Sequence, residues 1–135
     1  MKEEVSIRLI SKESDLPDIA SRNFFHSVEF FRILEATPMQ EPRMAIAMDE
    51  RGKVVAHMLT IVTYHKSLLP PALYSHGRVY GEGEYDEGIE REEMFRRFLD
   101  VVTESFKHRM CLYIEFSHLG SKMFGYESFR SKGYF

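Results

Sequence analysis

The chain has 135 residues, of which 44% are hydrophobic and 29% are charged, as is typical of a single globular domain. Its 18 lysine and arginine residues against 21 acidic residues give a net charge of −3, which argues against a surface for nucleic acid or anionic membranes. The single cysteine, Cys111, excludes an intrachain disulfide. Because the sequence contains neither a membrane-spanning apolar run nor the apolar core of a secretory signal, we expect one soluble, cytoplasmic domain over residues 1–135.

The first third of the chain predicts one strand and two helices. Residues 5–10 alternate apolar and polar side chains, as a half-buried strand does. Ser14 is placed to cap a short helix that carries Pro17 in its first turn. A second helix with an apolar stripe is expected after Ser27. It should end before Pro38, because the residue that precedes a proline disfavours helical backbone.

The middle of the chain predicts three strands. Residues 44–48 form a short apolar run, and residues 53–64 form a longer run rich in β-branched side chains. The segment 49–52 between them ends in glycine and predicts a tight turn, so the two runs should form a hairpin. Pro70-Pro71 interrupts the chain before a further predicted strand over residues 73–80.

The last third predicts a helix, a strand and a final helix. Residues 90–109 have apolar side chains at helical spacing, with acidic residues first and basic residues last, as the helix dipole favours. A strand over 110–117 and a helix over 121–132, closed by Gly133, should follow. This order predicts an α/β (α+β) fold, in which helices flank both faces of a mixed, mainly antiparallel sheet. Because apolar residues end the chain directly after a helix, we expect it to be truncated before a further strand.

The strand predicted over 73–80 places four aromatic or basic side chains on one face, since strand side chains alternate with a period of two. These are Tyr74, His76, Arg78 and Tyr80. One interpretation is that the row lines a substrate cleft, and the other is that it covers part of the sheet that no helix covers. Nearby glycines either cradle an anion through their backbone amides or serve a bulge and a loop turn. These glycines are Gly77, Gly81 and Gly83.

The element order and two short motifs resemble the GNAT acyltransferase superfamily. Residues 78–83, Arg-Val-Tyr-Gly-Glu-Gly, are similar to its motif [Gln/Arg]-x-x-Gly-x-[Gly/Ala], whose amides cradle the pyrophosphate of acyl-coenzyme A. Residues 129–134 are similar to the Tyr-x-x-x-Gly-Phe-like end of its last helix. The resemblance implies a GNAT-like fold and the transfer of an acyl group to an amine. It also implies that Arg78 and the three glycines bind acetyl-coenzyme A or another acyl-coenzyme A.

A closer resemblance is to the N-terminal half of FemAB-type proteins, the GNAT-fold aminoacyl or peptidyl transferases of cell-wall synthesis. Residues 24–31 are similar to their Phe-x-x-Ser-x-x-Trp/Phe pattern, the hairpin 44–59 to their hairpin, and residues 74–78 to their glycine-rich strand end. This resemblance implies an aminoacyl donor, with aminoacyl-tRNA as one form. It also implies that residues 1–135 are one of two similar halves.

Acyl transfer to an amine needs a base that deprotonates the amine, a positioned donor and a stabilised oxyanion. Glu115 lies within the strand 110–117, where a carboxylate is unusual because unpaired buried charge is costly. It is either the base or the ionic partner of a neighbouring lysine or arginine. Phe129 stands where the family often has a tyrosine that acts as the general acid. Tyr126 either replaces that acid or is part of the core. The six histidines lack metal-ligand spacing, so we expect no metal site.

The segment between the glycine motif and the following helix departs from acetyl-coenzyme A enzymes, where the helix begins at once and its amides meet the phosphate. Here residues 84–89 intervene, and the acidic side chains over 82–93 should repel a pyrophosphate, so we expect weak binding of acetyl-coenzyme A. The alternative function is a non-catalytic GNAT-like module that binds a peptide or protein partner. We also expect self-association through the sheet edge formed by residues 110–117.

Overall fold

A six-stranded sheet runs through the part of the chain that the computed structural model describes, which is residues 5–66, 73–106 and 111–117. Its main path has the order β1-β2-β3-β4-β6, and β5 pairs with β3. The β4–β6 pair is parallel and the other pairs are antiparallel. The strands are β1 (Ser6–Ile10), β2 (Gln40–Met48), β3 (Val54–Lys66), β4 (Leu73–Tyr80), β5 (Glu84–Tyr85) and β6 (Cys111–Ser117).

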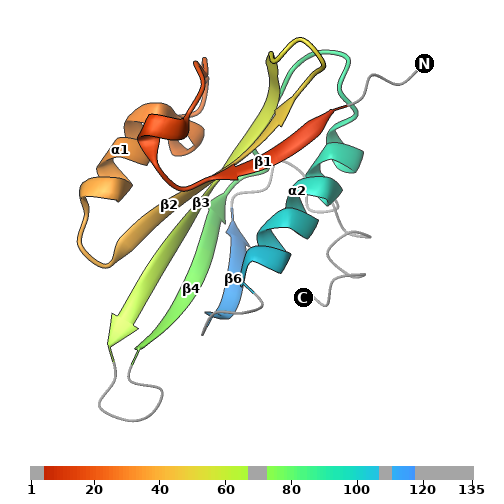
Figure 1. The fold of residues 1–135 in the computed structure, drawn as a ribbon. Helices are drawn as coiled ribbons and strands as arrows, with labels where there is room; N and C mark the ends of the chain where they lie inside the picture. Colours follow the sequence, from red (N-terminus) through yellow and green to blue (C-terminus); the bar gives the residue numbers. More distant parts are fainter. Residues whose placement is uncertain (1–4, 67–72, 107–110, 118–135) are drawn as a thin grey trace.

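Two α-helices lie on opposite faces of this sheet within the described residues (Figure 1). The first, α1 (Val28–Ala36), is capped by Ser27, whose Oγ accepts a hydrogen bond from the Phe30 amide at 3.1 Å. It ends before Pro38, as predicted. The second, α2 (Arg91–Phe106), confirms the predicted helix, whose last turn over 107–109 lies outside the described residues. The mixed, mainly antiparallel sheet with a helix on each face is therefore confirmed.

The helix expected after Ser14 is wrong. The chain forms only a 3-10 turn there, η1 (Glu13–Asp15), and its N-cap is Lys12. Leu16 already has extended backbone, with φ −75° and ψ 132°. Leu16 precedes Pro17, and the residue before a proline is pushed out of the helical region. A second 3-10 turn, η2 (Phe24–His26), and the strand β5 have no counterpart among the predicted elements.

Both faces of the central strands are buried, and neighbouring residues of β2 alternate between two apolar clusters. Phe31 and Leu34 of α1 pack with Met44, Ile46, Leu59 and Ile61. Phe95, Phe98 and Val102 of α2 pack with Ala45, Ala47, Met58, Val62 and Val79. Burial on both faces explains why β2 reads as a continuous apolar run, which a sheet covered on one face would not require. A few polar side chains of these strands are buried as well, among them Arg43, His57 and Thr60.

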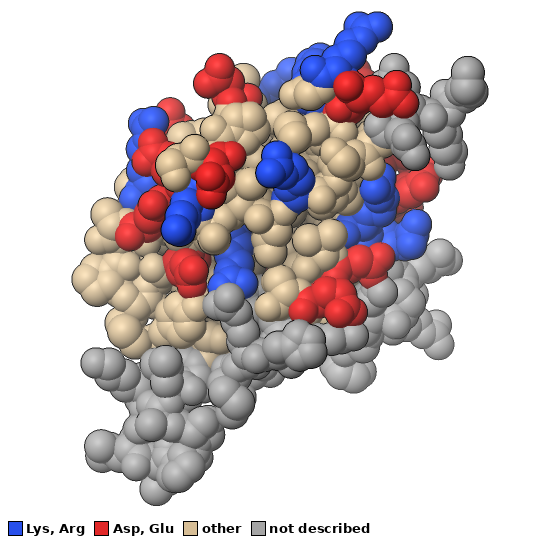
Figure 2. All heavy atoms as spheres, in the orientation of Figure 1, with Lys and Arg blue, Asp and Glu red and all other residues tan. Residues whose placement is uncertain are grey.

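The charged side chains on the face shown in Figure 2 mix both signs. Among the described residues there, lysine and arginine lie between aspartate and glutamate rather than in a patch of one sign. Within the described residues, no helix is long and apolar enough to cross a membrane.

Gly83 allows the segment after β4 to pack closely against β3. It has φ +90°, and a Cβ at this position would lie 2.7 Å from the carbonyl oxygen of His57. Gly52, in the β2–β3 turn, has a similar φ of +81° but open space where its Cβ would be. The two positions share the same backbone preference and differ in their surroundings.

Gly83→Ala should therefore destabilise the protein more than Gly52→Ala. A positive φ costs an alanine about 1 kcal/mol at either position, and the backbone clash at Gly83 should add about 1–3 kcal/mol. Urea unfolding of the two variants measures the difference. Equal losses of unfolding free energy would show that the close approach to His57 is not a constraint.

Candidate active site on the α1-facing side of β4

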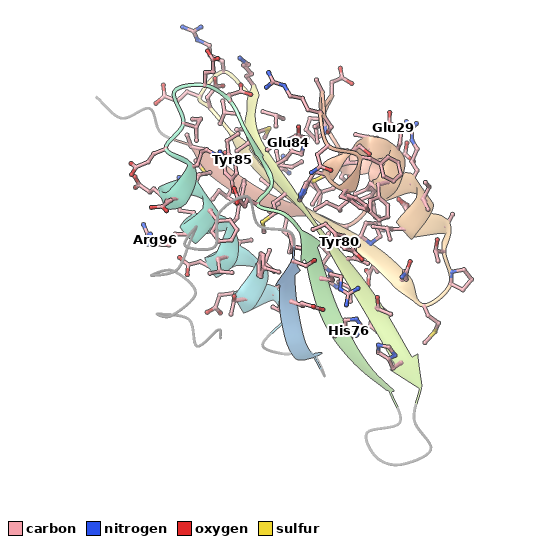
Figure 3. The ribbon with its side chains drawn as sticks, turned by 180° about the vertical axis from the view of Figure 1, so that it is seen from behind. Glu29, His76, Tyr80, Glu84, Tyr85 and Arg96 are labelled. Atoms are coloured by element: carbon pink, nitrogen blue, oxygen red, sulfur yellow. The ribbon has the colours of Figure 1, made fainter. Side chains whose placement is uncertain are left out.

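A row of polar side chains lies along β4 on the face that carries α1. His76 and Tyr80 both lie on β4 (Figure 3), and Arg78 lies between them in the sequence. Val79 points to the other face, into the cluster under α2. Tyr80 packs against the cluster under α1, which fixes the side of the sheet on which the row lies. This alternation confirms that His76, Arg78 and Tyr80 share a face, as predicted from the sequence. Whether the row lines a substrate cleft remains a prediction.

Arg78 connects β4 to β6 and to Tyr80. It lies directly opposite Glu115 in the parallel register, and its Nη2 and Nε donate to the same Glu115 oxygen at 2.7 and 3.1 Å. Its Nη1 donates to the Tyr80 hydroxyl at 3.3 Å. These hydrogen bonds, to Tyr80 and then to Glu115, raise the pKa of Arg78. The Arg78 and Glu115 side chains are 39% and 44% exposed, so a ligand can reach both ends of the pair.

His65 and His76 form a stacked pair further along the same strands. Their ring centroids lie 4.7 Å apart, and His65 Nε2 is 2.7 Å from His76 Nδ1, so one nitrogen donates to the other. Burial lowers the pKa of His76, and the neighbouring His65 and Arg78 lower it further. His76 is therefore a neutral imidazole near pH 7. No group of three or more potential metal ligands gathers anywhere in the described ranges.

His26 replaces one step of the β3–β4 ladder. The ladder pairs Ile61 with Arg78, and continuing the antiparallel register would pair Leu59 with Tyr80. Instead the Leu59 amide donates to His26 Nδ1 at 3.0 Å, and His26 Nε2 donates to the Tyr80 carbonyl at 2.6 Å. The imidazole thus stands between two backbone groups that would otherwise bond to each other. Since Nδ1 accepts a hydrogen bond, the ring is neutral and carries its proton on Nε2.

Glu84 ties the segment before η2 to the sheet. It lies opposite His57 in the β3–β5 pair, and His57 Nε2 donates to Glu84 Oε2 at 3.0 Å. The other oxygen, Oε1, accepts from the amides of Arg22 at 2.6 Å and Asn23 at 3.3 Å. Ser21 Oγ lies 3.1 Å from the same His57 nitrogen and donates to the His26 carbonyl. One carboxylate therefore joins β3, β5 and the chain leading into η2.

Four aromatic rings adjoin the polar row. The rings of Phe24 and Phe30 stack with centroids 5.1 Å apart, and Phe25 meets both of them edge-on. Phe25 also lies against Tyr80, with centroids 4.7 Å apart. We call Phe24, Phe25, Phe30 and Tyr80 the four-ring cluster. Through Tyr80 it is continuous with the Arg78–Glu115 pair.

A separate open pocket of about 1090 Å³ lies between residues 17–22, the start of β3 and the segment 83–87. Several of its ionic groups are engaged with one another or with neighbours. Lys53 lies 3.4 Å from Asp86, His57 pairs with Glu84, and Arg91 donates to the buried Glu82 at 2.9 Å. We place the candidate site at the Arg78–Glu115 pair rather than in this pocket, because this pair and the Tyr80 hydroxyl join a guanidinium, a carboxylate and a hydroxyl by hydrogen bonds.

The glycines predicted to bind a cofactor have structural roles. Gly81, with φ +86°, donates its amide to the Ser117 carbonyl at 2.6 Å, and Gly83 packs against His57. Gly77 lies beside an irregularity in the β4–β6 register. These positions match the bulge and turn interpretation, and an anion cradle at them stays a prediction. Among the other predicted site residues, Tyr126 and the side chain of Tyr74 lie outside the described residues.

The first two acidic residues of the acidic segment, Glu82 and Glu84, are paired inside the fold. Glu82 is 7% exposed and accepts from Arg91, and Glu84 accepts from His57 and two backbone amides. Their charges are therefore partly compensated, as is that of Asp86 beside Lys53. The repulsion of a pyrophosphate expected from the sequence rests more on the exposed Glu87, Glu90 and Glu92.

The sequence analysis did not identify His26, His57 or Glu84 as site residues. His57 stands alone in an apolar run, and that isolation was the one local sign of a buried polar partner. His26 and Glu84 lie in a 3-10 turn and a two-residue strand, which leave no periodic pattern in the sequence.

Acid should weaken the fold through these buried histidines. Burial lowers the pKa of His26 from 6.5 to about 4 and lowers that of His57 as well. Below pH 6.5 the unfolded chain binds a proton that folded His26 does not, so stability falls as the pH drops toward 4. His26 alone should contribute about 3 kcal/mol to this loss. NMR titration of its ring protons measures the midpoint, with the urea-unfolded chain as the control, and a folded-state midpoint near the unfolded value would contradict the buried bridge.

No protein-family model and no curated protein matches the sequence, whereas several solved structures match the fold. A protein described as a probable acetyltransferase superposes with a TM-score of 0.58 and 11% identity, over 80% of this chain and 68% of the other. Glucosamine-6-phosphate N-acetyltransferase from Arabidopsis thaliana superposes with a TM-score of 0.52 and 15% identity, over 85% of this chain and 82% of the other. An aminoglycoside acetyltransferase, meta-AAC0020, from an uncultured soil metagenomic sample superposes with a TM-score of 0.57 and 10% identity, over 96% of this chain and 86% of the other. At these identities the similarity concerns architecture, and the described chain has the fold of GNAT acetyltransferases.

Proposed function

We propose that this domain transfers an acyl or aminoacyl group to an amine, with its active site at the Arg78–Glu115 pair and Tyr80. Two observations support the proposal: the GNAT fold, and the placement of Arg78 and Tyr80 on β4 with Glu115 opposite Arg78 on β6. The connected hydrogen bonds of Arg78 to Glu115 and to Tyr80 carry the assignment of the site. They bring a carboxylate, a guanidinium and a hydroxyl together on one partly open face.

Each of the three groups has one role in the proposed transfer. The amine nitrogen attacks the acyl carbon, and its proton passes to the Glu115 carboxylate as the new C–N bond forms. The guanidinium of Arg78 stabilises the negative charge that develops on the acyl oxygen. The bond to the leaving atom then breaks, and that atom takes a proton from the Tyr80 hydroxyl, which Arg78 orients. Tyr126 is the other candidate for this acid.

We further propose an aminoacyl donor, as in FemAB-type transferases, and a chain that forms one of two similar halves. The resemblance of residues 24–31 to the FemAB pattern supports this choice. It is also supported by the Gly81 amide, which is engaged with Ser117, and by β5, which lies between the glycine motif and the start of α2. These features leave less room for a pyrophosphate at the helix start than a short glycine turn would.

The alternative is a non-catalytic module that binds a peptide or protein. One observation favours it: Arg78 and Glu115 satisfy each other, as they would in a purely structural ion pair. The two functions differ in what substitution of this pair would change. Loss of chemistry with retained fold supports the transferase, whereas loss of stability alone supports the module.

Arg78→Gln and Glu115→Gln should each lower kcat/KM for acyl transfer about 100-fold, because each removes a group that acts in the transition state. The assay uses the polypeptide of the complete reading frame, with aminoacyl-tRNA and acetyl-coenzyme A as donors and a peptide amine as acceptor. Arg96→Gln is the matched control, since Arg96 is an exposed arginine on α2 (Figure 3). Undiminished transfer by both site variants, or no transfer by the unmodified protein with either donor, contradicts the proposal.

Acetyl-coenzyme A should bind the domain only weakly. Exposed acidic side chains lie near the predicted cradle, and the Gly81 amide already has a partner. Isothermal calorimetry at moderate salt tests this expectation. A micromolar or tighter dissociation constant, equivalent to about −8 kcal/mol, would instead favour a conventional acetyltransferase.

A further inference from the structure

The most exposed apolar side chains of the described chain include two neighbouring rings in one short turn. Phe24 and Phe25 of η2 are 51% and 42% exposed. They are not on a loosely held loop. The Asn23 side chain accepts from the Phe25 amide at 3.0 Å, the next residue is the buried His26, and Glu84 holds the two residues before the turn. Several hydrogen bonds, of which the one between the Leu59 amide and His26 is buried, therefore hold the turn that presents the two rings to solvent.

The open area of these rings suits a small group better than a protein. A phenylalanine side chain buries about 150–250 Å² when it is covered completely, so two rings at these exposures leave roughly 200 Å² open. A stable protein interface needs about 800 Å² on each partner. An apolar group of the size of one amino-acid side chain matches the open area.

The position of the rings indicates which group they would receive. Phe25 lies against Tyr80, and the Arg78 guanidinium lies 5.8 Å from the centre of the Tyr80 ring. An aminoacyl group joins its carbonyl to its side chain through a single Cα. A group whose carbonyl meets Arg78 can therefore place its side chain on the rings next to it.

We propose that the four-ring cluster is the subsite for an apolar side chain of the transferred aminoacyl group, with Phe24 and Phe25 as its specificity-determining residues. This inference rests on the proposed function, because the carbonyl is assigned to Arg78 there. The preference arises because an apolar side chain is removed from water against the rings, whereas glycine offers nothing to bury.

Binding of two blocked amino acids to the ¹⁵N-labelled full chain tests the subsite without any assay of transfer. N-acetyl-L-phenylalaninamide and N-acetylglycinamide have the same backbone and differ only in the side chain. We expect the phenylalanine probe to shift the amide signals of Phe25 and Tyr80 and to bind about tenfold more tightly. Phe25→Ala should abolish this preference. Ile33→Ala should preserve it, since Ile33 is a 52% exposed apolar residue outside the four-ring cluster.

Phe24→Ala is the second variant, and it tests the subsite should Phe25→Ala fail to fold. The ¹⁵N spectrum of each variant shows whether that variant retains the fold. Equal binding of the two probes, or a preference that survives both ring variants, overturns the subsite. Transfer assays separate this failure from failure of the proposed function. A side-chain preference at the rings without any transfer keeps an apolar binding site there but rejects the transferase. Transfer that depends on Arg78 but ignores the donor side chain keeps the transferase and rejects the subsite.

Discussion

The neutral imidazole of His26 is the contact on which the arrangement of β3, β4, β5 and η2 depends. It bonds the Leu59 amide with one nitrogen and the Tyr80 carbonyl with the other, and so occupies the place of a direct bond between β3 and β4. Beyond this point β3 is paired by β5 instead, at Ala56 and His57. The separation of the two strands would leave two backbone groups without partners in a buried region, and such groups are costly. The histidine supplies both partners at once.

The same arrangement explains why Glu84 and η2 lie where they do. Once β4 has left β3, the turn through Gly81 and Gly83 brings β5 back against β3 and sets Glu84 beside His57. Glu84 then holds the chain that leads into η2, and η2 supplies His26 itself. Each contact in this circuit places the next one. These contacts also bring Phe25 of η2 against Tyr80, at the end of the row that carries Arg78.

The periodic elements of this fold could be predicted from the sequence, because their side chains report burial residue by residue. The stripe of α2, the Ser27 cap of α1 and the β2–β3 hairpin all leave such patterns. β2 begins at Gln40, four residues before its predicted start. The prediction left out its first residues because Pro42 is atypical of a strand. The row on β4 could be predicted for the same reason, through its period of two. The partner of Glu115 could be predicted only by type, because the choice of Arg78 depends on the parallel register of β4 and β6.

The roles of His26, His57 and Glu84 could not be predicted, since their interactions join segments that are distant in the chain. His26 and Glu84 also lie in elements of only three and two residues. The central claim is that the His26 ring, and not a direct backbone bond, connects Leu59 to Tyr80. Scalar couplings across hydrogen bonds, measured by NMR on the ¹⁵N,¹³C-labelled chain, test it directly. We predict a coupling between the Leu59 amide nitrogen and His26 Nδ1. A coupling from the Leu59 amide to the Tyr80 carbonyl would instead show a closed strand pair and contradict the account.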